Sequence, residues 1–148
     1  MPHTLDIGFQ LHSLSNLMRR RMEHSEVFSH MDDNVTRNNG WILNYLAHHS
    51  DRDIYQKDIE NDFCIRPSTV SKVIRLMESK GLLCREAVPG DARLKKLVLT
   101  PEGKKLQAAI EREQQETERL LRRGVTEEEL RVFHQVMEKF KKYIPYWA

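Results

Sequence analysis

The segment that most constrains this fold runs from Arg66 to Gly81, RPSTVSKVIRLMESKG. Its sequence contains signals for both ends of a helix and separates apolar from polar residues on two faces. Pro67 suits the first position of a helix, where the backbone N–H is unpaired anyway, and Gly81 suits the left-handed residue just past a helix end. Four apolar residues fall within one arc of roughly 100° at helical spacing: Val70, Val73, Ile74 and Met77. The segment is therefore predicted to be a short helix with one buried face.

The opposite face of this helix carries small hydroxyls and cations and no carboxylate. Its residues are Ser68, Lys72, Arg75 and Ser79, with Ser71 at the edge. Cations on a surface helix most often only interact with water. The face alone therefore does not indicate a partner, and the segments on either side of it decide the interpretation.

The preceding segment, Gln56 to Phe63, is a second short helix candidate with Ile59 and Phe63 on one side. A tight connection of residues 64–66 joins the two helices. Two short helices joined in this way form a helix-turn-helix, whose second helix enters the major groove of DNA with its N-terminal residues foremost. The acid-free face is thus a candidate DNA-reading surface.

A β-hairpin is predicted after this helix. Residues 82–87 and 94–100 are strand candidates around a Pro89-Gly90-Asp91 turn. Four cations converge on the hairpin: Arg85, Arg93, Lys95 and Lys96. A helix-turn-helix followed by a basic hairpin is a winged helix, in which the wing reaches the adjacent backbone or minor groove of the DNA.

The charge distribution also favours a polyanionic partner. The net charge is only +2, but residues 63–100 carry 8 Lys/Arg against 3 Asp/Glu, whereas residues 1–62 carry 6 against 10. With 148 residues and 39% hydrophobic content, the chain suits one globular domain. No apolar run suits a membrane span, and two cysteines without a secretory leader argue against an exported domain. We therefore expect a cytoplasmic protein.

Helices are predicted on both sides of the winged helix. Residues 7–22 repeat apolar side chains at spacings of three and four, and a second helix covers about residues 36–48. The latter places Trp41, Ile42, Tyr45 and Leu46 on one side. After the hairpin, Thr100-Pro101 begins a long helix that continues to about Arg123. Its middle, EREQQETER, has almost no apolar residue, so we expect it in solvent between two bodies.

The apolar stripe of the last predicted helix indicates that the chain forms a dimer. Thr126 and Glu129 form a capping-box sequence at the start of this helix. A wide apolar stripe follows: Leu130, Phe133, Val136, Met137, Phe140 and Ile144. One chain has no obvious surface left to cover this stripe and the first helix together, whereas a second copy does.

The run from Ile54 to Leu106 resembles the core of the MarR (multiple antibiotic resistance regulator) family of bacterial transcription factors, and the flanking helices match its length and order. Four features carry the resemblance: STVS in the second helix, ESKGLL at its end with Arg85 close behind, D-x-R at Asp91 to Arg93, and L-T-x-x-G at Leu99 to Gly103. Tyr55 departs from the family, which usually has Thr or Ser there, so either the helix start is weaker or the cap moves to Asp53. The wing is also short.

The resemblance implies a mainly α (α+β) fold made of one domain over residues 1–148. The winged helix-turn-helix would cover about residues 36–100, and residues 5–30 and 101–148 would supply dimerisation helices. It further implies a homodimer, acting as a ligand-responsive repressor on a pseudo-palindromic double-stranded DNA operator. The candidate DNA-binding residues are Arg66, Ser68, Thr69, Ser71, Lys72, Arg75, Arg93 and Lys95, with Asp91 orienting Arg93 in the minor groove.

Family members respond to small phenolic or lipophilic molecules, to oxidation or to metal. Met18, Trp41 and Tyr45 are candidates for an effector pocket, with plain core packing as the alternative. Cys64 and Cys84 are expected to be small buried hydrophobes.

Two other functions stay open beside a ligand-responsive regulator. One is a winged-helix module that binds protein, and the other is a redox- or metal-responsive regulator. An enzyme is not expected, because no phosphate loop, metal pattern or nucleophile elbow is present, and we expect neither a cofactor nor a metal site.

Overall fold

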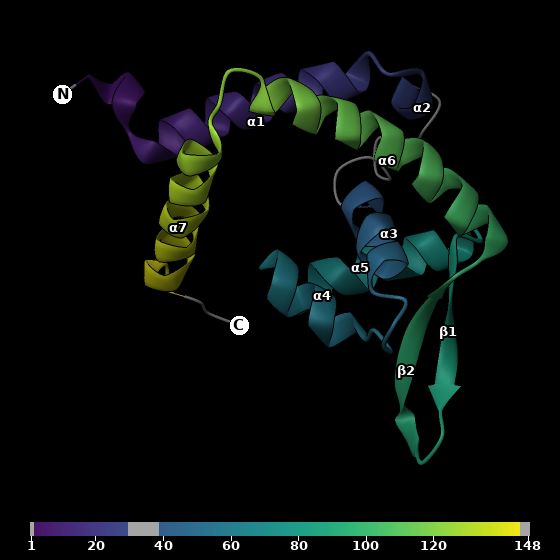
Figure 1. Cartoon of the computed structure of the whole chain (residues 1–148). Coiled ribbons are helices and arrows are strands. Elements are labelled where there is room, and N and C mark those ends of the chain that lie inside the picture. The colour runs from purple at the N-terminus through teal and green to yellow at the C-terminus, as the bar shows by residue number, and fades with distance from the viewer. Residues whose placement is uncertain (1, 30–38, 146–148) are drawn as a thin grey trace. The chain divides into compact units, whose positions relative to one another are not determined.

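The structure is a computed structural model that describes residues 2–29 and 39–145. The described elements, in chain order, are the 3-10 helix η1 (His3–Leu5), α1 (Ile7–Glu23), α2 (Glu26–Ser29), α3 (Asn39–His48), α4 (Gln56–Phe63), α5 (Pro67–Ser79), β1 (Leu83–Val88), β2 (Asp91–Leu99), α6 (Pro101–Arg122) and α7 (Glu127–Tyr143). Figure 1 shows these elements along the chain. None of the described helices is both long enough and apolar enough to cross a membrane.

The chain divides into two compact units, Met1–Glu113 and Gln114–Ala148. Helix α6 runs from the first unit into the second, as its polar middle predicts. The prediction that this middle stands wholly in solvent is wrong, because Glu111, Glu113 and Gln114 are half-buried. The exposed part begins at Glu118, where every residue up to Arg122 is exposed and ion pairs Arg119–Glu116 and Arg122–Glu118 lie along the helix.

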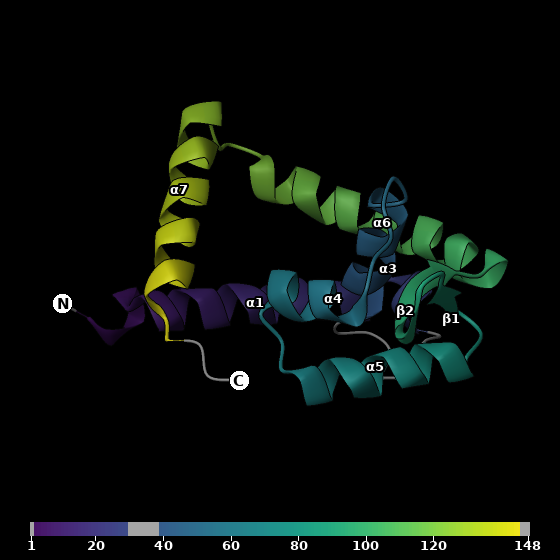
Figure 2. The same ribbon diagram turned by 90° about the horizontal axis from the view of Figure 1, so that it is seen from below.

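The core of the first unit lies where α3, α4, α5 and the base of the hairpin meet. Its fully buried side chains include Ile42, Leu43, Ile59, Val70, Ile74, Met77 and Leu83. Helix α5 contributes the apolar face predicted for it, with Val73 half-buried at the edge. Its ends also agree with prediction: Pro67 is the first helical residue, and Gly81 has a φ of 73°. Burying one face of α5 leaves its polar face exposed, and Figure 2 shows this helix along the lower edge of the lobe.

The hairpin is a two-stranded antiparallel sheet that projects from the helices (Figure 1). Leu83 pairs with Leu99 at its base, and the register shifts between Ala87 and Val88 near its tip. The predicted extended piece before α4 is hydrogen-bonded to β2, since Leu97 N donates to Ile54 O at 2.8 Å. The wing is therefore fastened on both sides of its base.

The start of α6 explains the L-T-x-x-G sequence in physical terms. Thr100 Oγ1 accepts from Gly103 N at 3.0 Å and caps the helix. Thr100 N donates to Leu82 O at 3.1 Å, which brings the helix against the chain at the beginning of β1. Gly103 is buried there, and a side chain at this position would collide with the Leu82 carbonyl. Hence α6 and the hairpin meet backbone to backbone.

Several local predictions need correction or lie outside the described residues. In α3 the buried hydrophobic side chains are those of Ile42, Leu43 and Leu46, whereas Trp41 keeps 49% of its surface exposed. Residues 36–38 of the predicted second helix, and the loop expected at 30–34, lie outside the described residues. The expectation that Cys64 is buried is wrong: it is exposed, and it ends α4 in the left-handed conformation with a φ of 55°. Cys84 is half-buried.

Candidate DNA interface

The outward face of α5 presents donors and cations without a carboxylate. Ser68, Thr69, Lys72 and Arg75 are exposed, and so is Arg66, whose backbone caps the helix by accepting from Thr69 N at 3.0 Å. None of Arg66, Lys72 and Arg75 has a carboxylate within ion-pair distance among residues 2–29 and 39–145. Uncompensated cations on an exposed ridge favour a negative partner.

Ser71 differs from the other candidates on this helix. Its side chain is half-buried at the seam between α4 and α5, and its hydroxyl oxygen accepts from Gln56 Nε2 at 2.7 Å. Gln56 also donates to Glu60 Oε2 at 3.2 Å. The sequence does not single out Gln56 or Glu60, because the contact to Ser71 joins residues fifteen positions apart and no local pattern marks it.

Two of the four cations on the wing lie close to carboxylates, and the other two do not. Arg85 Nε lies 3.8 Å from Glu78, and Lys96 Nζ lies 3.7 Å from Asp53 and 3.8 Å from Glu86. By contrast, within the described part of the chain Arg93 and Lys95 lie in no ion pair, and both are exposed. These two are the wing residues left to meet a partner.

The Asp91 carboxylate binds the backbone amide of Arg93 and not the Arg93 guanidinium, which is the predicted partner. Asp91 Oδ1 accepts from the backbone N–H of Arg93 at 3.0 Å. This contact is an Asx turn. The short Asp91 side chain reaches the backbone amide two residues on more readily than it reaches the guanidinium at the end of the long Arg93 side chain. The prediction that Asp91 orients the Arg93 guanidinium therefore needs correction: it shapes the irregular stretch of β2 from which Arg93 projects.

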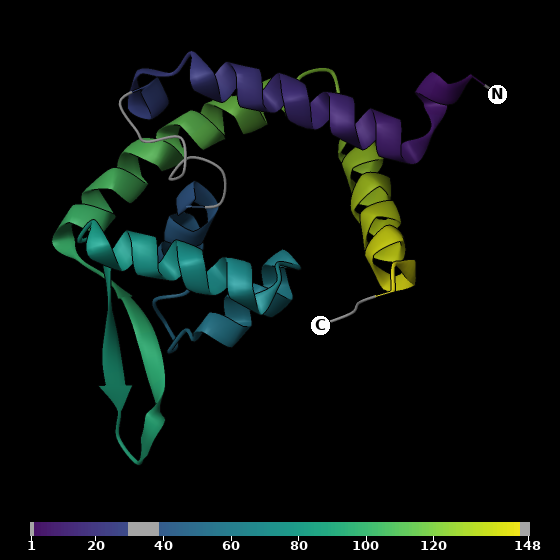
Figure 3. The same cartoon turned by 180° about the vertical axis from the view of Figure 1, so that it is seen from behind.

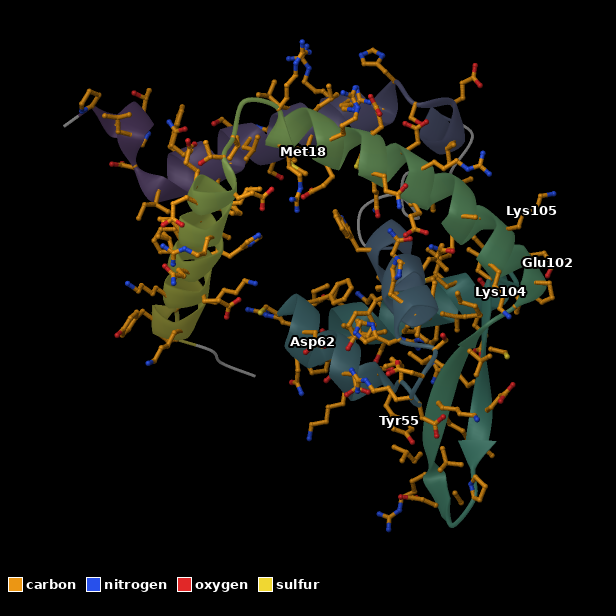
Figure 4. All side chains as sticks on the ribbon, in the orientation of Figure 1. Met18, Tyr55, Asp62, Glu102, Lys104 and Lys105 are labelled. Atoms are coloured by element: carbon orange, nitrogen blue, oxygen red, sulfur yellow. The ribbon has the colours of Figure 1, made fainter. Side chains whose placement is uncertain are left out.

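Helix α4 is held at its start by a residue other than the expected cap. Asp58 Oδ2 accepts from Tyr55 N at 2.9 Å, so a carboxylate in the first turn satisfies the N–H of the residue before the helix, and Asp53 pairs instead with Lys96. Near the other end of α4, Asp62 accepts from the Tyr45 hydroxyl. Figure 4 labels Tyr55 and Asp62 at these two places.

Tyr45 joins α3 to α4. Its ring packs on Phe63 with centroids 5.5 Å apart, and Arg52 donates to its hydroxyl at 3.2 Å. Burial raises the pKa of the Tyr45 hydroxyl, and the hydrogen bond to Asp62 raises it further. The hydroxyl is thus a neutral donor that fixes the helix-turn-helix against α3.

The hollow that the structure describes is not lined by Met18, Trp41 or Tyr45, the three candidate pocket residues. A shallow hollow of about 560 Å³ is lined by Arg21, His24, Ser25, Glu26, Val27 and Glu113. Met18 is half-buried on α1, and Trp41 is half exposed on α3. The residues that the structure describes contain no cluster of three or more side chains suited to hold a metal ion.

Polar contacts also join α3 to α6. Gln107, which is 7% exposed, donates to Asn44 Oδ1 and to Glu111 Oε2, both at 2.9 Å, and His48 Nε2 lies 2.6 Å from Glu111 Oε1. The hydrogen bond from Gln107 lowers the pKa of the Glu111 carboxyl, burial opposes this, and the contact with His48 lowers it as well. No local sequence pattern marks this set either.

The comparisons with known proteins agree with this architecture. The model of the MarR family matches residues 33–94, which contain α3, the helix-turn-helix and most of the hairpin. No curated protein sequence matches the chain. Solved structures match along nearly the whole chain.

Three of these structures give the scale of the likeness. A crystal structure of S. aureus MepR in its DNA-binding conformation is 25% identical, with a TM-score of 0.80 over 93% of this chain and 98% of that one. A complex of S. aureus MepR with DNA is 26% identical, with a TM-score of 0.78 over 95% and 99%. The transcription regulator MarR from Oenococcus oeni is 25% identical, with a TM-score of 0.75 over 93% and 99%. With the family model on its winged helix-turn-helix and these transcription regulators matching along nearly its whole length, the chain is similar to the MarR family of transcription regulators.

Proposed function

We propose that this protein regulates transcription as a homodimer that binds a pseudo-palindromic DNA operator, with α5 in the major groove and the wing beside it. The observation that carries the proposal is the exposed, acid-free ridge of α5, together with the two wing cations that lack a carboxylate partner in the described chain. MepR, to which this chain is similar, has been crystallised with DNA, and this likeness supports the proposal.

Specific roles follow from position on the helix and wing. Ser68, Thr69 and Lys72 lie on or near the outermost ridge in the first turns of α5, so they are the proposed base-reading residues. Arg66, Arg75 and Lys95 are proposed to bind phosphates, and Arg93 to enter the minor groove. A repressor blocks transcription by occupying its operator, and this is the sign of regulation that we propose.

The exposed apolar faces of the first and last helices support the homodimer. In α1, Ile7, Leu11 and Leu14 are 55%, 42% and 41% exposed, and no residue of α1 is buried. In α7, Phe133 is 49% exposed and no residue is buried, and Ile144 just after the helix is 71% exposed. Apolar faces of this extent need a cover, and a second copy presents the same faces. Light scattering at micromolar concentration tests this, and a soluble monomer would refute it.

Response to a small phenolic or lipophilic effector stays a prediction. The half-exposed Trp41 and half-buried Met18 would need a second surface to form a pocket, which dimerisation could supply. Titrating phenols into a Trp147→Phe variant, which keeps Trp41 as its single tryptophan, and following fluorescence checks whether Trp41 senses them.

The test of DNA binding uses Lys72→Ala against a matched control. Fragments selected from random duplexes by the wild type provide the operator. Lys72→Ala should lower affinity, and if Lys72 binds a phosphate, the slope of log K against log salt should become shallower by about 1 for each such residue removed. Lys105→Ala, which removes the same charge from the exposed side of α6 (Figure 4), should leave the affinity near wild type. Equal affinities for all three proteins would reject α5 as the reading helix.

A further inference from the structure

The hydrogen bonds of Gln56 fix the direction of the hydroxyl group on Ser71. Gln56 Nε2 faces both Glu60 Oε2 at 3.2 Å and Ser71 Oγ at 2.7 Å. An ionised carboxylate only accepts hydrogen bonds, so the amide group turned toward Glu60 must be the NH₂. Both of its hydrogens are then used, one on each partner. Ser71 Oγ is therefore an acceptor at the seam between α4 and α5.

A hydroxyl that accepts from one side still has its own proton to donate. That proton must point away from Gln56, and among the described residues the Ser71 hydroxyl makes no hydrogen bond to a second partner. Ser71 is only half-buried, so the proton faces an accessible edge of α5. Figure 3, which views α5 from the other side of the lobe, shows this helix in front of α3 and α4.

Arg75 lies one turn further on and is turned toward the same place. Its Nε donates to the Ser71 backbone carbonyl at 3.3 Å, which folds the guanidinium back along the helix. Because Nε is used, the terminal N–H groups remain to bind another group, and Arg75 has no ion pair within the described chain. Ser71 and Arg75 thus present donors only, one neutral and one cationic, side by side.

We propose that the Ser71 hydroxyl and the Arg75 guanidinium together bind one backbone phosphate of the DNA, and that Gln56 and Glu60 are positioning residues that keep the hydroxyl turned outward as a donor. A phosphate offers acceptors only and so matches a site with donors only, whereas base edges mix donors and acceptors. Ser71 also lies at the edge of the reading face, where a helix in the groove meets the flanking backbone. The inference rests on the proposed function, because it assumes that α5 binds DNA.

Gln56→Glu tests the direction of the hydroxyl. A carboxylate cannot donate, so Ser71 must turn its proton inward to it and can no longer donate to the phosphate. We expect Gln56→Glu and Ser71→Ala each to lower operator affinity about tenfold per half-site, the scale of a hydrogen bond to a charged group. Gln56→Met removes the amide without adding charge and leaves the hydroxyl able to donate, so its effect should be much smaller. Thermal melting checks that all variants fold.

The double variant separates hydroxyl direction from simple charge repulsion. If Gln56→Glu acts through Ser71, it should cause no further decrease in affinity in a Ser71→Ala background. If it acts only by adding a negative charge near DNA, it should cause the same decrease in both backgrounds, and the positioning role of Gln56 would be overturned.

Operators with single methylphosphonates identify the phosphate itself. One position per half-site should weaken wild-type binding and weaken Ser71→Ala less, because that variant keeps the Arg75 guanidinium but no longer carries the hydroxyl that binds there. If both proteins respond alike at every position while the wild type binds its operator, this inference fails and the proposed function stands. If the wild type selects no DNA, the proposed function fails with it.

Discussion

A methyl group added at Gly103 tests the joint between the hairpin and α6. A Cβ built at this position lies 1.9 Å from Leu82 O and 2.9 Å from Leu82 C, both backbone atoms. Leu82 O already accepts from Thr100 N at 3.1 Å, and the next residue, Leu83, is buried and paired with Leu99. The collision therefore cannot be relieved by rotating a side chain, and either the first turn of α6 or the base of the wing must move.

The expected cost follows from two opposing effects. Overpacking a well-packed site costs about 1 to 3 kcal/mol, and an approach this short to backbone atoms belongs at the upper end or beyond it. Replacing Gly by Ala in a helix returns up to about 1 kcal/mol. We therefore expect Gly103→Ala to lower the free energy of unfolding by about 2 kcal/mol or more, or the melting temperature by about 4 to 8 °C in a chain of this size.

Urea denaturation at one fixed protein concentration measures this difference, since the stability of an associating chain depends on concentration. Gly8→Ala in α1 is the matched control, because nothing in the described chain lies within 4 Å of a Cβ at Gly8. It should be neutral or stabilising by up to about 1 kcal/mol. A Gly103→Ala protein as stable as the wild type would refute the close approach of α6 to Leu82.

Two further predictions concern the wing and the contacts between α3 and α6. Arg93→Ala should lower affinity most on operators with A·T-rich flanks, where a narrow minor groove attracts cations, and titrating two duplexes that differ only in their flanks checks this; equal decreases would reject the minor-groove role. Because the folded state lowers the pKa of Glu111, its contribution to stability is present above the ordinary Glu value of about 4.3 and is lost as the pH falls through the lowered value. Glu111→Gln should therefore be less stable than the wild type near neutrality, with the difference shrinking in acid, and a gap constant down to the acid transition of the fold would contradict it.

The elements that can be predicted from sequence are those with local signals. The bounds of α4 and α5 and the turn of the hairpin follow from Pro67, Gly81 and the Pro-Gly-Asp turn, because each signal acts on the backbone within a few residues of itself. The apolar face of α5 is predictable for the same reason, since helical periodicity is a local property. Fold and family are consequently within reach of the sequence.

The hydrogen-bond partners of side chains cannot be predicted from sequence, because they depend on how separate helices and strands are packed. The contact between Gln56 and Ser71 needs the crossing of α4 and α5, which no spacing in the sequence encodes. Asp91 has two possible donors in Arg93, and only the backbone path decides between its amide and its guanidinium. Helical spacing assigns Trp41 to the buried side of α3, and the structure puts Leu43 there in its place.

Helix α6 can be lengthened by inserting residues into its exposed stretch from Glu118 to Arg122. Its shape there depends on ion pairs within the helix and not on a core, so added turns would open no cavity. Seven extra residues would lengthen the rod by about 10 Å and turn its far end by only about 20° from the original face. If α7 pairs two chains without needing α1, operators with more widely separated half-sites become accessible by insertion alone, and regulators with new spacing requirements follow without redesign of a single base contact.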